Sequence, residues 1–411
     1  MSTTATQNGR IFTKIDDPVL ISAPKDWEVV PLKRVARLQY GDSLSSEFRE
    51  DGSFKVYGSN GPVGSHSEAN TFGPALIVGR KGSFGKVVFT EYPAFAIDTT
   101  YYIDSRHCSH NLRWLFYILS VLKLDGFSKD SAIPGLDRDD AYIRRIPLPP
   151  RVEQDAIVGY LDAKLEQIDR FITNKRHLIE LLEEERQRTI HMAITRGMNP
   201  DVKLKPTGIK WLPQIPQHWE MRRNGTLFDE RKQKGHEDLP VLMVSINTAV
   251  TLDRPNQVRE QQQIADKEKY AFAAKNDIAF NMMRMWQGAV GVVPVDGNVS
   301  PAYVVCKPRQ NVDPRYYELL FRTKLYQGEV FCYSYGIVLD RNRLYWIGFK
   351  SIFSPYPPIE EQKEIIKKIS TMTKEVEEAK SKAQAEIDLI NEFRTSLIAE
   401  AVTGKIEINN K

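Results

Sequence analysis

Cysteine, metal-binding spacings and long apolar runs are all scarce in this sequence. The three cysteines, Cys108, Cys306 and Cys332, are widely separated and form no Cys-x-x-Cys pair. An odd number of isolated cysteines indicates a reducing compartment and argues against a disulfide framework. The seven histidines show no His-Glu-x-x-His or similar spacing, so we expect no metal site in this chain.

The longest strongly apolar stretch is too short to span a membrane. It runs over residues 112–124, "LRWLFYILSVLKL", whereas a spanning helix needs about 20 apolar residues. We therefore expect a buried helix there. The first residues lack the apolar core of a secretory signal, and we expect a cytoplasmic protein. The formal net charge of +4 is small for 411 residues and by itself gives little evidence for nucleic acid.

A glycine-rich segment, "GRKGSFGKV" at residues 79–87, is the most obvious candidate for binding phosphate. It fails the nucleotide-binding pattern Gly-x-x-x-x-Gly-Lys-Ser/Thr, because five residues separate Gly79 from Gly85 and Val87 follows Lys86. The residues after it predict a strand, so no helix N-terminus faces an anion. Two alternatives stay open: a loop that contacts DNA, or a tight hairpin with solvated lysines at its tip.

The chain repeats itself in order. Trp-Glu follows three residues after Pro24 and again after Pro216. Further segments recur in the same sequence along both halves. The paired segments are 82–89 with 287–295, 112–119 with 315–321, 135–143 with 338–347, and 146–154 with 354–362.

Each repeat ends in a long helical pattern of equal length. From Gln154 to Thr195 is 41 residues, as is the distance from Gln362 to Thr403. Apolar residues with 4-3 spacing predict a coiled-coil seam in both segments. A lone helix of this kind would favour a dimerisation element, whereas two equal copies in one chain can pair antiparallel with each other. The seam residues are Ile157, Leu161, Leu165, Ile168, Ile172, Ile179 and Leu182 in the first, and Ile365, Ile369, Met372, Val376, Ala379, Ala383, Ile387, Ile390 and Leu397 in the second.

The segments before these helices alternate short β-like runs with Gly/Asn/Pro turns and occasional helices. We predict an α+β fold: two α+β globular domains in tandem, separated by two long antiparallel coiled-coil helices, with an internal pseudo-twofold repeat. The predicted bounds are 1–150, 151–205, 206–355 and 356–411 for the first globule, its helix and linker, the second globule and its helix.

The ordered doublet resembles the specificity subunits of type I restriction–modification systems, the HsdS family. The first copy carries the resemblance through Trp27-Glu28, "YGSNGPVG" (57–64), "ALIVGRKGSFGKV", "AIDTTYYI" (96–103) and "IPLPPRVEQDAIVGYLD". The second carries it through "IPQHWE", "SPYPPIEEQKEIIKKI" and "LIAEAVTGKIE". The second globule departs from the pattern, because it lacks "YGSNG" and replaces the Arg-Lys-Gly loop.

The resemblance implies that each globule is a target recognition domain reading one half of a bipartite DNA site. The helices would set the spacer and dock two modification subunits, which bring S-adenosylmethionine and methylate adenine. Two restriction subunits would bring ATP and magnesium chemistry. This chain would be non-catalytic and hold no cofactor. Its sequence agrees, since it has no Asn/Asp-Pro-Pro-Tyr/Phe methyltransferase motif and no Gly-x-Ser-x-Gly elbow.

Candidate contacts follow from these motifs. Basic, hydroxyl and amide side chains suit phosphates and base edges, and Trp286 offers a stacking plane. The Glu-Gln pairs that open the helices are candidates for the partner interface, although acidic charge at a helix N-terminus explains them nearly as well. The DNA candidates are Tyr57, Ser59, Asn60, Arg80, Lys81, Ser83, Lys86 and Thr99 in the first globule and Arg284, Trp286, Gln287 and Ser300 in the second; the partner candidates are Glu153, Gln154, Glu361 and Gln362.

Two other functions stay open at this point. The first is a divergent DNA methyltransferase or nuclease that uses the loops as a substrate pocket. The second is a coiled-coil scaffold without sequence reading. Binding of S-adenosylmethionine by the isolated chain would favour the former, and equal affinity for all DNA sequences the latter.

Overall fold

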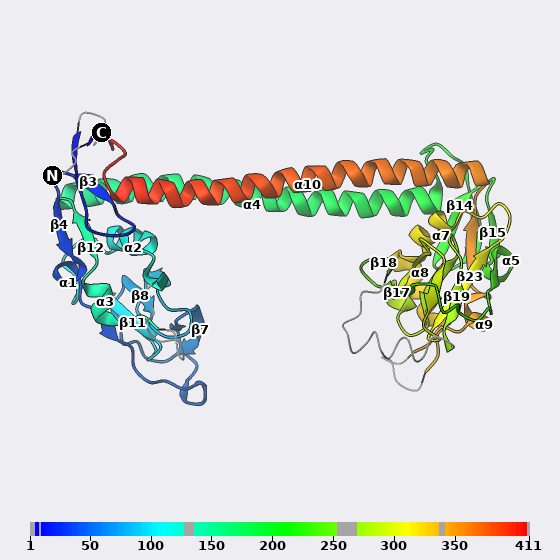
Figure 1. The fold of residues 1–411 in the computed structure, drawn as a ribbon, viewed down its shortest axis with the longest axis horizontal. Helices are drawn as coiled ribbons and strands as arrows, with labels where there is room; N and C mark the ends of the chain where they lie inside the picture. Colours follow the sequence, from blue (N-terminus) through cyan, green and yellow to red (C-terminus); the bar gives the residue numbers. More distant parts are fainter. Residues whose placement is uncertain (1–4, 8–9, 127–134, 253–268, 337–341, 409–411) are drawn as a thin grey trace. The chain divides into compact units, whose positions relative to one another are not determined.

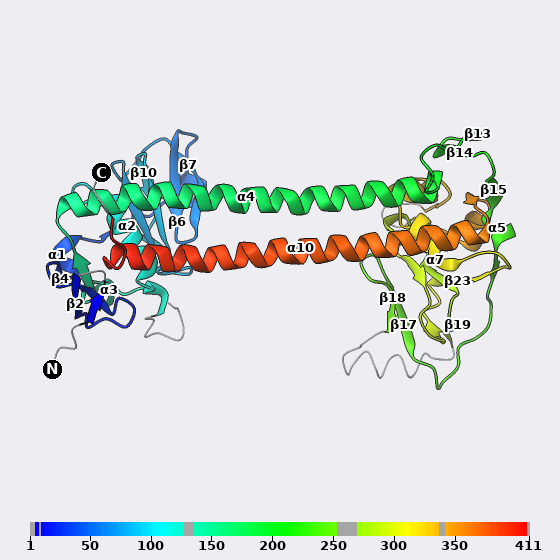
Figure 2. The ribbon, with the colours of Figure 1, turned by 90° about the horizontal axis from the view of Figure 1, so that it is seen from above.

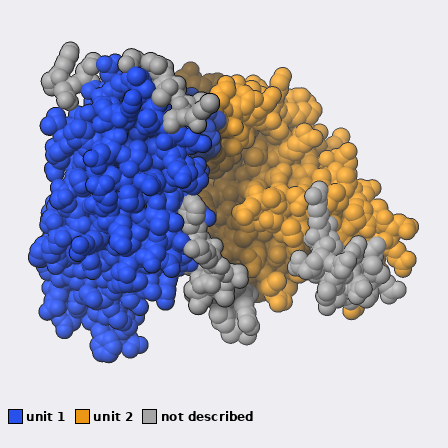
Figure 3. Space-filling model, turned by 60° about the vertical axis from the view of Figure 1, so that its left-hand side comes forward, with its two compact units in different colours: residues 1–176, 383–411 blue, residues 177–382 orange. Residues whose placement is uncertain are grey.

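The computed structural model describes residues 5–7, 10–126, 135–252, 269–336 and 342–408. It divides into two compact units (Figure 3). Unit 1 comprises residues 1–176 and 383–411, and unit 2 comprises residues 177–382. Each unit therefore holds one globular domain together with the end of one long helix and the beginning of the other (Figures 1 and 2).

The globular domain of unit 1 is built on two small sheets. One has the order β5-β11-β8-β9 with antiparallel neighbours, and the other has the order β10-β6-β7, in which β10 runs parallel to β6. The helix α2, Leu112–Val121, packs on β8 and β9 and buries Trp114 and Ile118, as its apolar sequence predicts. The strands are β5 Gln39–Tyr40, β6 Phe54–Gly58, β7 Gly61–His66, β8 Ala75–Gly79, β9 Val87–Thr90, β10 Ala94–Ala96 and β11 Thr100–Asp104.

Short elements connect this domain to the helices. The strands β4 and β12 pair antiparallel directly before the first long helix, and β1-β2-β3 form a small N-terminal sheet. Their bounds are β1 Ala5–Gln7, β2 Arg10–Lys14, β3 Ser22–Pro24, β4 Glu28–Pro31 and β12 Arg145–Leu148, with helices α1 Leu32–Val35, η1 Ser46–Phe48, η2 Leu124–Gly126 and α3 Arg138–Tyr142.

Unit 2 repeats this plan. Its main sheet has the order β16-β23-β20-β21, and its second sheet has the order β18-β17-β22-β19, in which β17 and β22 are parallel. The strands are β13 Leu204–Ile209, β14 Leu212–Pro216, β15 Glu220–Arg223, β16 Phe228–Glu230, β17 Val241–Ser245, β18 Ala249–Leu252, β19 Ala271–Ala273, β20 Ile278–Asn281, β21 Val290–Val292, β22 Gly297–Val299, β23 Tyr303–Pro308 and β24 Phe353–Tyr356; the helices are α5 Asn224–Leu227, η4 Met285–Gln287, α7 Pro314–Phe321, α8 Lys324–Cys332 and α9 Trp346–Phe349.

The two long helices, α4 (Arg151–Arg196) and α10 (Ile359–Val402), follow from the heptad-like spacing. Within each unit they lie side by side (Figures 1 and 2). Ion pairs fix an antiparallel register, with Lys175 Nζ 2.5 Å from Glu386 Oε2 in unit 1 and Lys380 Nζ 3.1 Å from Glu183 Oε2 in unit 2. Such exposed pairs are worth about 0–1 kcal/mol each, so the apolar seam supplies most of the stability. The seam residues Ile157, Leu161, Ile168, Ile172, Ile365, Ile369, Ala383, Ile387 and Leu397 are buried.

The α+β prediction is confirmed, and the repeat is visible at the level of single residues. The strand β8 ends at Gly79, whose N–H donates to Lys86 O, and β20 ends at Asn281, whose N–H donates to Ala289 O. In both units the carbonyl group of the residue that follows, Arg80 or Met282, accepts a hydrogen bond from a leucine N–H. Leu136 N donates to Arg80 O at 2.9 Å, and Leu344 N donates to Met282 O at 2.8 Å.

These equivalences correct three details of the sequence comparison. Within the matched segments 82–89 and 287–295, Gly85, with φ +77°, corresponds to Gly288, with φ +94°, and not to Gly291, which lies inside β21. The partner of segment 135–143 begins near residue 343 rather than 338; residues 338–341 lie outside the described residues. The second domain also has a β17–β18 hairpin in the place of the β6–β7 hairpin, so it lacks only the "YGSNG" letters.

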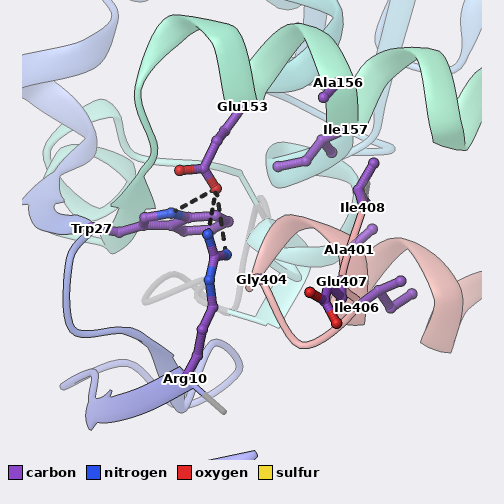
Figure 4. Close-up of a pocket in the computed structure, with 10 residues that line it drawn as sticks. All are labelled: Arg10, Trp27, Glu153, Ala156, Ile157, Ala401, Gly404, Ile406, Glu407 and Ile408. Atoms are coloured by element: carbon purple, nitrogen blue, oxygen red, sulfur yellow. Dashed lines mark hydrogen bonds and ion pairs between the residues drawn. The ribbon is translucent and has the colours of Figure 1, made fainter. Parts of the chain in front are cut away.

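Each globular domain is joined to the helices by an equivalent tryptophan. Trp27 Nε1 donates to Glu153 Oε2 at 3.1 Å in unit 1, and Trp219 Nε1 donates to Glu361 Oε2 at 2.9 Å in unit 2. Both indole rings are buried. In unit 1 the ring also borders a cavity of about 290 Å³ between the start of α4 and the end of α10, lined by Arg10 and Gly404 among others (Figure 4).

A glycine that ends one long helix lies against each tryptophan. Gly404 has φ +68°, and a Cβ atom there would lie 2.5 Å from Pro24 Cγ and 2.9 Å from the Trp27 ring. Gly197 has φ +75°, and its Cβ would lie 2.8 Å from Glu361 Oε1. The left-handed conformation ends the helix, and the missing side chain lets the ring approach. We call these two sites the tryptophan junctions.

Gly404→Ala is expected to destabilise the protein by about 1–3 kcal/mol, because the added methyl meets the Pro24 and Trp27 rings in a left-handed conformation. Gly159→Ala is the matched control. Gly159 is exposed within α4 with no atom near its Cβ position, so the substitution should stabilise the helix by up to about 1 kcal/mol. Denaturant unfolding measures both, and equal midpoints for the two variants would contradict the packing of Gly404 on Trp27.

A buried ion pair anchors the N-terminal segment of unit 1. Arg144 Nε donates to Asp17 Oδ2 at 2.6 Å, and both side chains are almost fully buried. Burial alone would raise the pKa of Asp17, but hydrogen bonds from Arg144 and from the N–H groups of Leu20 and Val19 hold it below its usual value of 3.8. The depressed pKa adds stability above pH 3.8 that is lost as the pH falls below it.

Asp17→Asn should cost about 3–5 kcal/mol at pH 7, because it removes the buried carboxylate that pairs with the Arg144 guanidinium. As the pH falls below 3.8 the carboxyl is protonated first in the unfolded chain and at still lower pH in the folded one, so the difference between the two unfolding free energies should shrink. Denaturant unfolding between pH 3 and pH 7 tests this. A constant difference across that range would mean that Asp17 does not act through its charge.

Candidate nucleic-acid interface

The glycine-rich loop joins β8 to β9, and several of its backbone N–H groups donate hydrogen bonds within the chain. Gly79 N donates to Lys86 O and Gly85 N to Gly79 O, both at 2.8 Å. Arg80 N and Lys81 N both donate to Thr99 O, at 2.9 and 3.2 Å. A phosphate-cradling loop needs such groups to point at the ligand. The loop is therefore a rigid hairpin that presents side chains, consistent with the failed nucleotide-binding pattern.

Side chains of this loop and of the β6–β7 turn meet in one place. Lys86 Nζ donates to Asn60 O at 2.7 Å and to Asn60 Oδ1 at 3.0 Å. Lys81, Ser83 and Asn60 are exposed, and Ser59 and Thr99 are half-buried. Next to them is a hollow of about 550 Å³, whose walls include Asn60, Ser83, Lys86 and Lys123. Most of the sequence candidates of the first domain thus lie on one polar surface.

Tyr57 does not belong to that surface. It is 5% exposed and packs in a small core with Ile77, Ala94 and Ala96. The reason is local: β6 is covered on both sides at its C-terminal end, where Val56 and Gly58 are also buried. Its prediction as a DNA contact is wrong for this structure, and a packing role replaces it.

The candidates of the second domain are less exposed as a group. Arg284 is exposed at the tip of the β20–β21 connection, and Gln287 is half-buried. Trp286 is half-buried, with its Nε1 donating to Met283 O at 3.0 Å and its ring edge-on to Phe331 at 5.8 Å. Ser300 Oγ accepts a hydrogen bond from Ala302 N at 3.3 Å in the turn before β23. Arg284 is thus the most available donor of the four.

Arg322, at the end of α7, holds the two loops of the second domain together. Its guanidinium donates to Ile246 O at 2.6 Å in the β17–β18 turn and to Val290 O at 3.0 Å after the β20–β21 loop. In the first domain Lys86 makes the corresponding bridge between hairpin and loop, but from a different position. Sequence comparison misses Arg322 for that reason.

Two further residues of the first domain lie beside Arg80 and were not among the candidates. These are Tyr40, on β5, and Arg138, the first residue of α3, and the guanidinium groups of Arg80 and Arg138 both stack on the Tyr40 ring. Arg138 belongs to the repeated segment 135–143, which could have drawn attention to it. Tyr40 carries no sequence signal, because only the sheet order brings β5 next to β11.

The four partner-interface candidates have contacts within the chain. Gln154 is 1% exposed and accepts from Asn111 N at 3.0 Å; Gln362 is fully buried and accepts from Asp313 N at 2.9 Å. Asn111 and Asp313 are the N-caps of α2 and α7, so each glutamine locks a domain helix to a long helix. This burial overturns a direct partner contact for both glutamines. The carboxylates of Glu153 and Glu361 are part of the tryptophan junctions and stay partly exposed.

The described residues contain no cluster of three or more His, Cys, Asp or Glu side chains suited to a metal ion. Among the helices that the structure describes, none is sufficiently long and apolar to cross a membrane. What the described surface offers is rigid loops carrying arginine, lysine and amide groups, on two domains built to one plan. These features are the ones expected of a tandem recognition protein for nucleic acid.

Comparison with known proteins shows which members of this class the chain resembles. Residues 24–184 match the family model for the Type I restriction modification DNA specificity domain. The chain is 23% identical to the type I restriction enzyme EcoBI specificity subunit of Escherichia coli over 80% of this chain and 73% of that protein. It is 22% identical to the Escherichia coli EcoDI specificity subunit over 93% of this chain and 89% of that protein.

A solved chain from work on complex assembly and conformational transition of the type I R-M system has the same fold. It aligns with a TM-score of 0.62 at 14% identity and covers 93% of this chain and 99% of its own length. Residues 24–184 thus match a type I restriction modification DNA specificity domain, and the whole chain is similar to type I restriction enzyme specificity subunits.

Arg322→Met should loosen both second-domain loops, because it removes the donor shared by their carbonyl groups. We expect a loss of about 1–3 kcal/mol and faster hydrogen exchange at residues 246–250 and 288–291. Arg315→Met is the matched control, since Arg315 is exposed on the same helix. Hydrogen exchange with mass spectrometry measures both variants; unchanged exchange in Arg322→Met would refute the bridging role.

Proposed function

We propose that this chain reads a bipartite DNA site and directs a type I modification and restriction complex to it. Each globular domain recognises a few base pairs in one half of the site. The paired helices α4 and α10 set the distance between the halves. Phosphate contacts position each domain and base-edge contacts specify the sequence.

The observation that carries this proposal is a repeated scaffold with unlike loops. The tryptophan junctions, the buried glutamines and the order of the main sheet are the same in both units. The loops at the corresponding ends of the sheets differ, with "GRKGSFGKV" in one and "NMMRMWQGAV" in the other. Such a pattern supports two readers with one architecture and two specificities.

The helices suit a spacer. At about 1.5 Å per residue, the 46 residues of α4 and 44 of α10 make rods of about 65–70 Å. Two weak half-site contacts then combine into one strong contact only when the half-sites have the separation that the rods set, at whole turns of the duplex. A continuous helix resists changes in this separation better than a flexible linker.

The chemistry is supplied by partners in this proposal. The chain is non-catalytic and cytoplasmic, and it holds no cofactor. Two methyltransferase subunits bind S-adenosylmethionine and methylate adenine in each half-site, and two restriction subunits supply ATP- and magnesium-dependent cleavage. The exposed faces of α4 and α10 are where the methyltransferase subunits dock, with Glu153 and Glu361 at the edges of that surface.

The test is to map methylated adenine in a host genome that co-expresses this chain with its modification subunit. Wild type should give one split motif with a fixed spacer. Exchanging residues 80–84 should change one half of the motif and leave the other half and the spacer intact. Exchanging residues 283–287 should change only the opposite half, which makes each variant the control for the other.

Methylation at a continuous site, or no dependence on sequence, would contradict the two-reader proposal. Binding of S-adenosylmethionine by the isolated chain, measured by calorimetry, would favour a divergent methyltransferase instead. Equal affinity of the complex for unrelated duplexes would favour a scaffold without sequence reading.

A further inference from the structure

Tyr40 lies between two arginine side chains in the first domain. The Arg80 guanidinium carbon is 4.8 Å from the centre of the Tyr40 ring, and that of Arg138 is 5.1 Å away. The three residues come from β5, from the loop after β8 and from α3. Tyr40 is 46% exposed, so this group reaches the surface. We call it the Tyr40 cluster.

Contacts with the main sheet and with the residues next to it fix the position of the cluster. Tyr40 pairs with Tyr101 on β11, and Arg80 NH1 donates to Asp98 O at 3.0 Å. Burial, and then the neighbouring Tyr40, raises the pKa of Tyr101 to about 12, so its hydroxyl stays protonated. That hydroxyl donates to Leu136 O at 3.1 Å and fixes the chain two residues before Arg138. The Arg80 guanidinium is therefore held by a hydrogen bond and by Tyr40, and that of Arg138 by Tyr40 on a fixed backbone.

The same three positions of the second domain carry different chemistry. Arg80 corresponds to Met282 and, through the Leu136–Leu344 equivalence, Arg138 corresponds to Trp346. Tyr40 corresponds to Lys232. The pairing of β16 with β23 continues through Arg231, whose N–H donates to Val305 O, and Lys232 is the next residue along the chain. The supporting residues Leu136 and Leu344 are both buried leucines. The three side chains therefore differ between the two domains, while the buried leucine beneath them is the same. This pattern is expected of residues that determine specificity.

Stacking leaves part of each guanidinium to read DNA, since Arg80 NH1 donates to Asp98 O and Arg138 Nε is buried. A guanidinium that stacks on an aromatic face uses its π surface, while its N–H groups lie in the plane and point outward. Two adjacent acceptors, O6 and N7 of guanine, are the base edge that matches this fork. A lysine in the same place would suit a phosphate, but it could not make the paired contact.

We infer that Arg80 and Arg138, oriented by Tyr40, read guanine in the half-site bound by the first domain. This inference rests on the proposed function and adds the base and the residues that select it. The second domain, with Met282 and Trp346 in their place, has no such fork at these positions and reads different bases.

The test uses the full chain in complex with its modification subunit. The half-site of the first domain is identified by the residue 80–84 exchange. Each guanine of that half-site, on either strand, is then replaced by 7-deazaguanine, which keeps base pairing and removes only the N7 acceptor. Competition binding compares wild type with Arg80→Lys, Arg138→Lys and the double variant. Arg34→Lys is the control, because Arg34 is an exposed arginine of the same unit outside the cluster.

Wild type and Arg34→Lys should lose about tenfold in affinity at one or two 7-deazaguanine positions. The double variant should bind the natural site about tenfold less tightly and lose nothing further on 7-deazaguanine. Its methylation map should keep the second half-site, which shows that the variant is folded. Tyr40→Leu should weaken the same discrimination while keeping both arginines.

A first half-site without guanine, or wild-type binding that is insensitive to every 7-deazaguanine, would overturn the inference while leaving the two-reader function in place. Equal 7-deazaguanine losses in wild type and double variant would do the same. The absence of any split motif in wild type would instead refute the proposed function itself.

Discussion

The hydrogen bond between a buried indole N–H and a glutamate at the start of a long helix is the contact on which the rest of the structure depends. It occurs twice, at Trp27–Glu153 and Trp219–Glu361. The indole N–H is an obligate donor that needs a partner when it is buried, and the first turn of a helix favours an acidic side chain. The glycine that ends the other long helix closes over the ring. Each junction therefore ties a globular domain to both helices at once, and disturbing it would release the domain from its rod.

This rigid attachment permits the loops to vary. The glutamine beside each glutamate bonds the N-terminus of a domain helix, so the main sheet has one orientation relative to the rod in each unit. The residues at the far end of the sheet differ between the two domains, as Met282 in place of Arg80 and Trp346 in place of Arg138 illustrate, and in unit 2 both side chains pack against the core. In the proposed function the junctions and the sheet supply the stability, and the side chains that differ at the end of the sheet supply the specificity.

Much of the architecture was predictable because it depends on patterns of residues that are close together in the sequence. Heptad-like spacing predicted α4 and α10, and repeated Trp-Glu and Glu-Gln pairs predicted the duplication. The surface was harder to predict, because it depends on which strands become neighbours. Tyr57 sits in a recognisable motif but is buried by that neighbourhood, and Gln154 and Gln362 are drawn inward by helix caps 43 and 49 residues away. Tyr40 and Arg322 meet their partners only through tertiary structure, so no local pattern marks them.

The most direct test of the central claim is a hydroxyl-radical footprint of the complex on a duplex carrying its methylated site. Two domains fixed to a rod of constant length should protect two short patches, separated by an accessible spacer that keeps its length when the loop of either domain is exchanged. One continuous protected stretch, or a spacer that changes with the loops, would show that the tryptophan junctions do not hold two independent readers at a set distance.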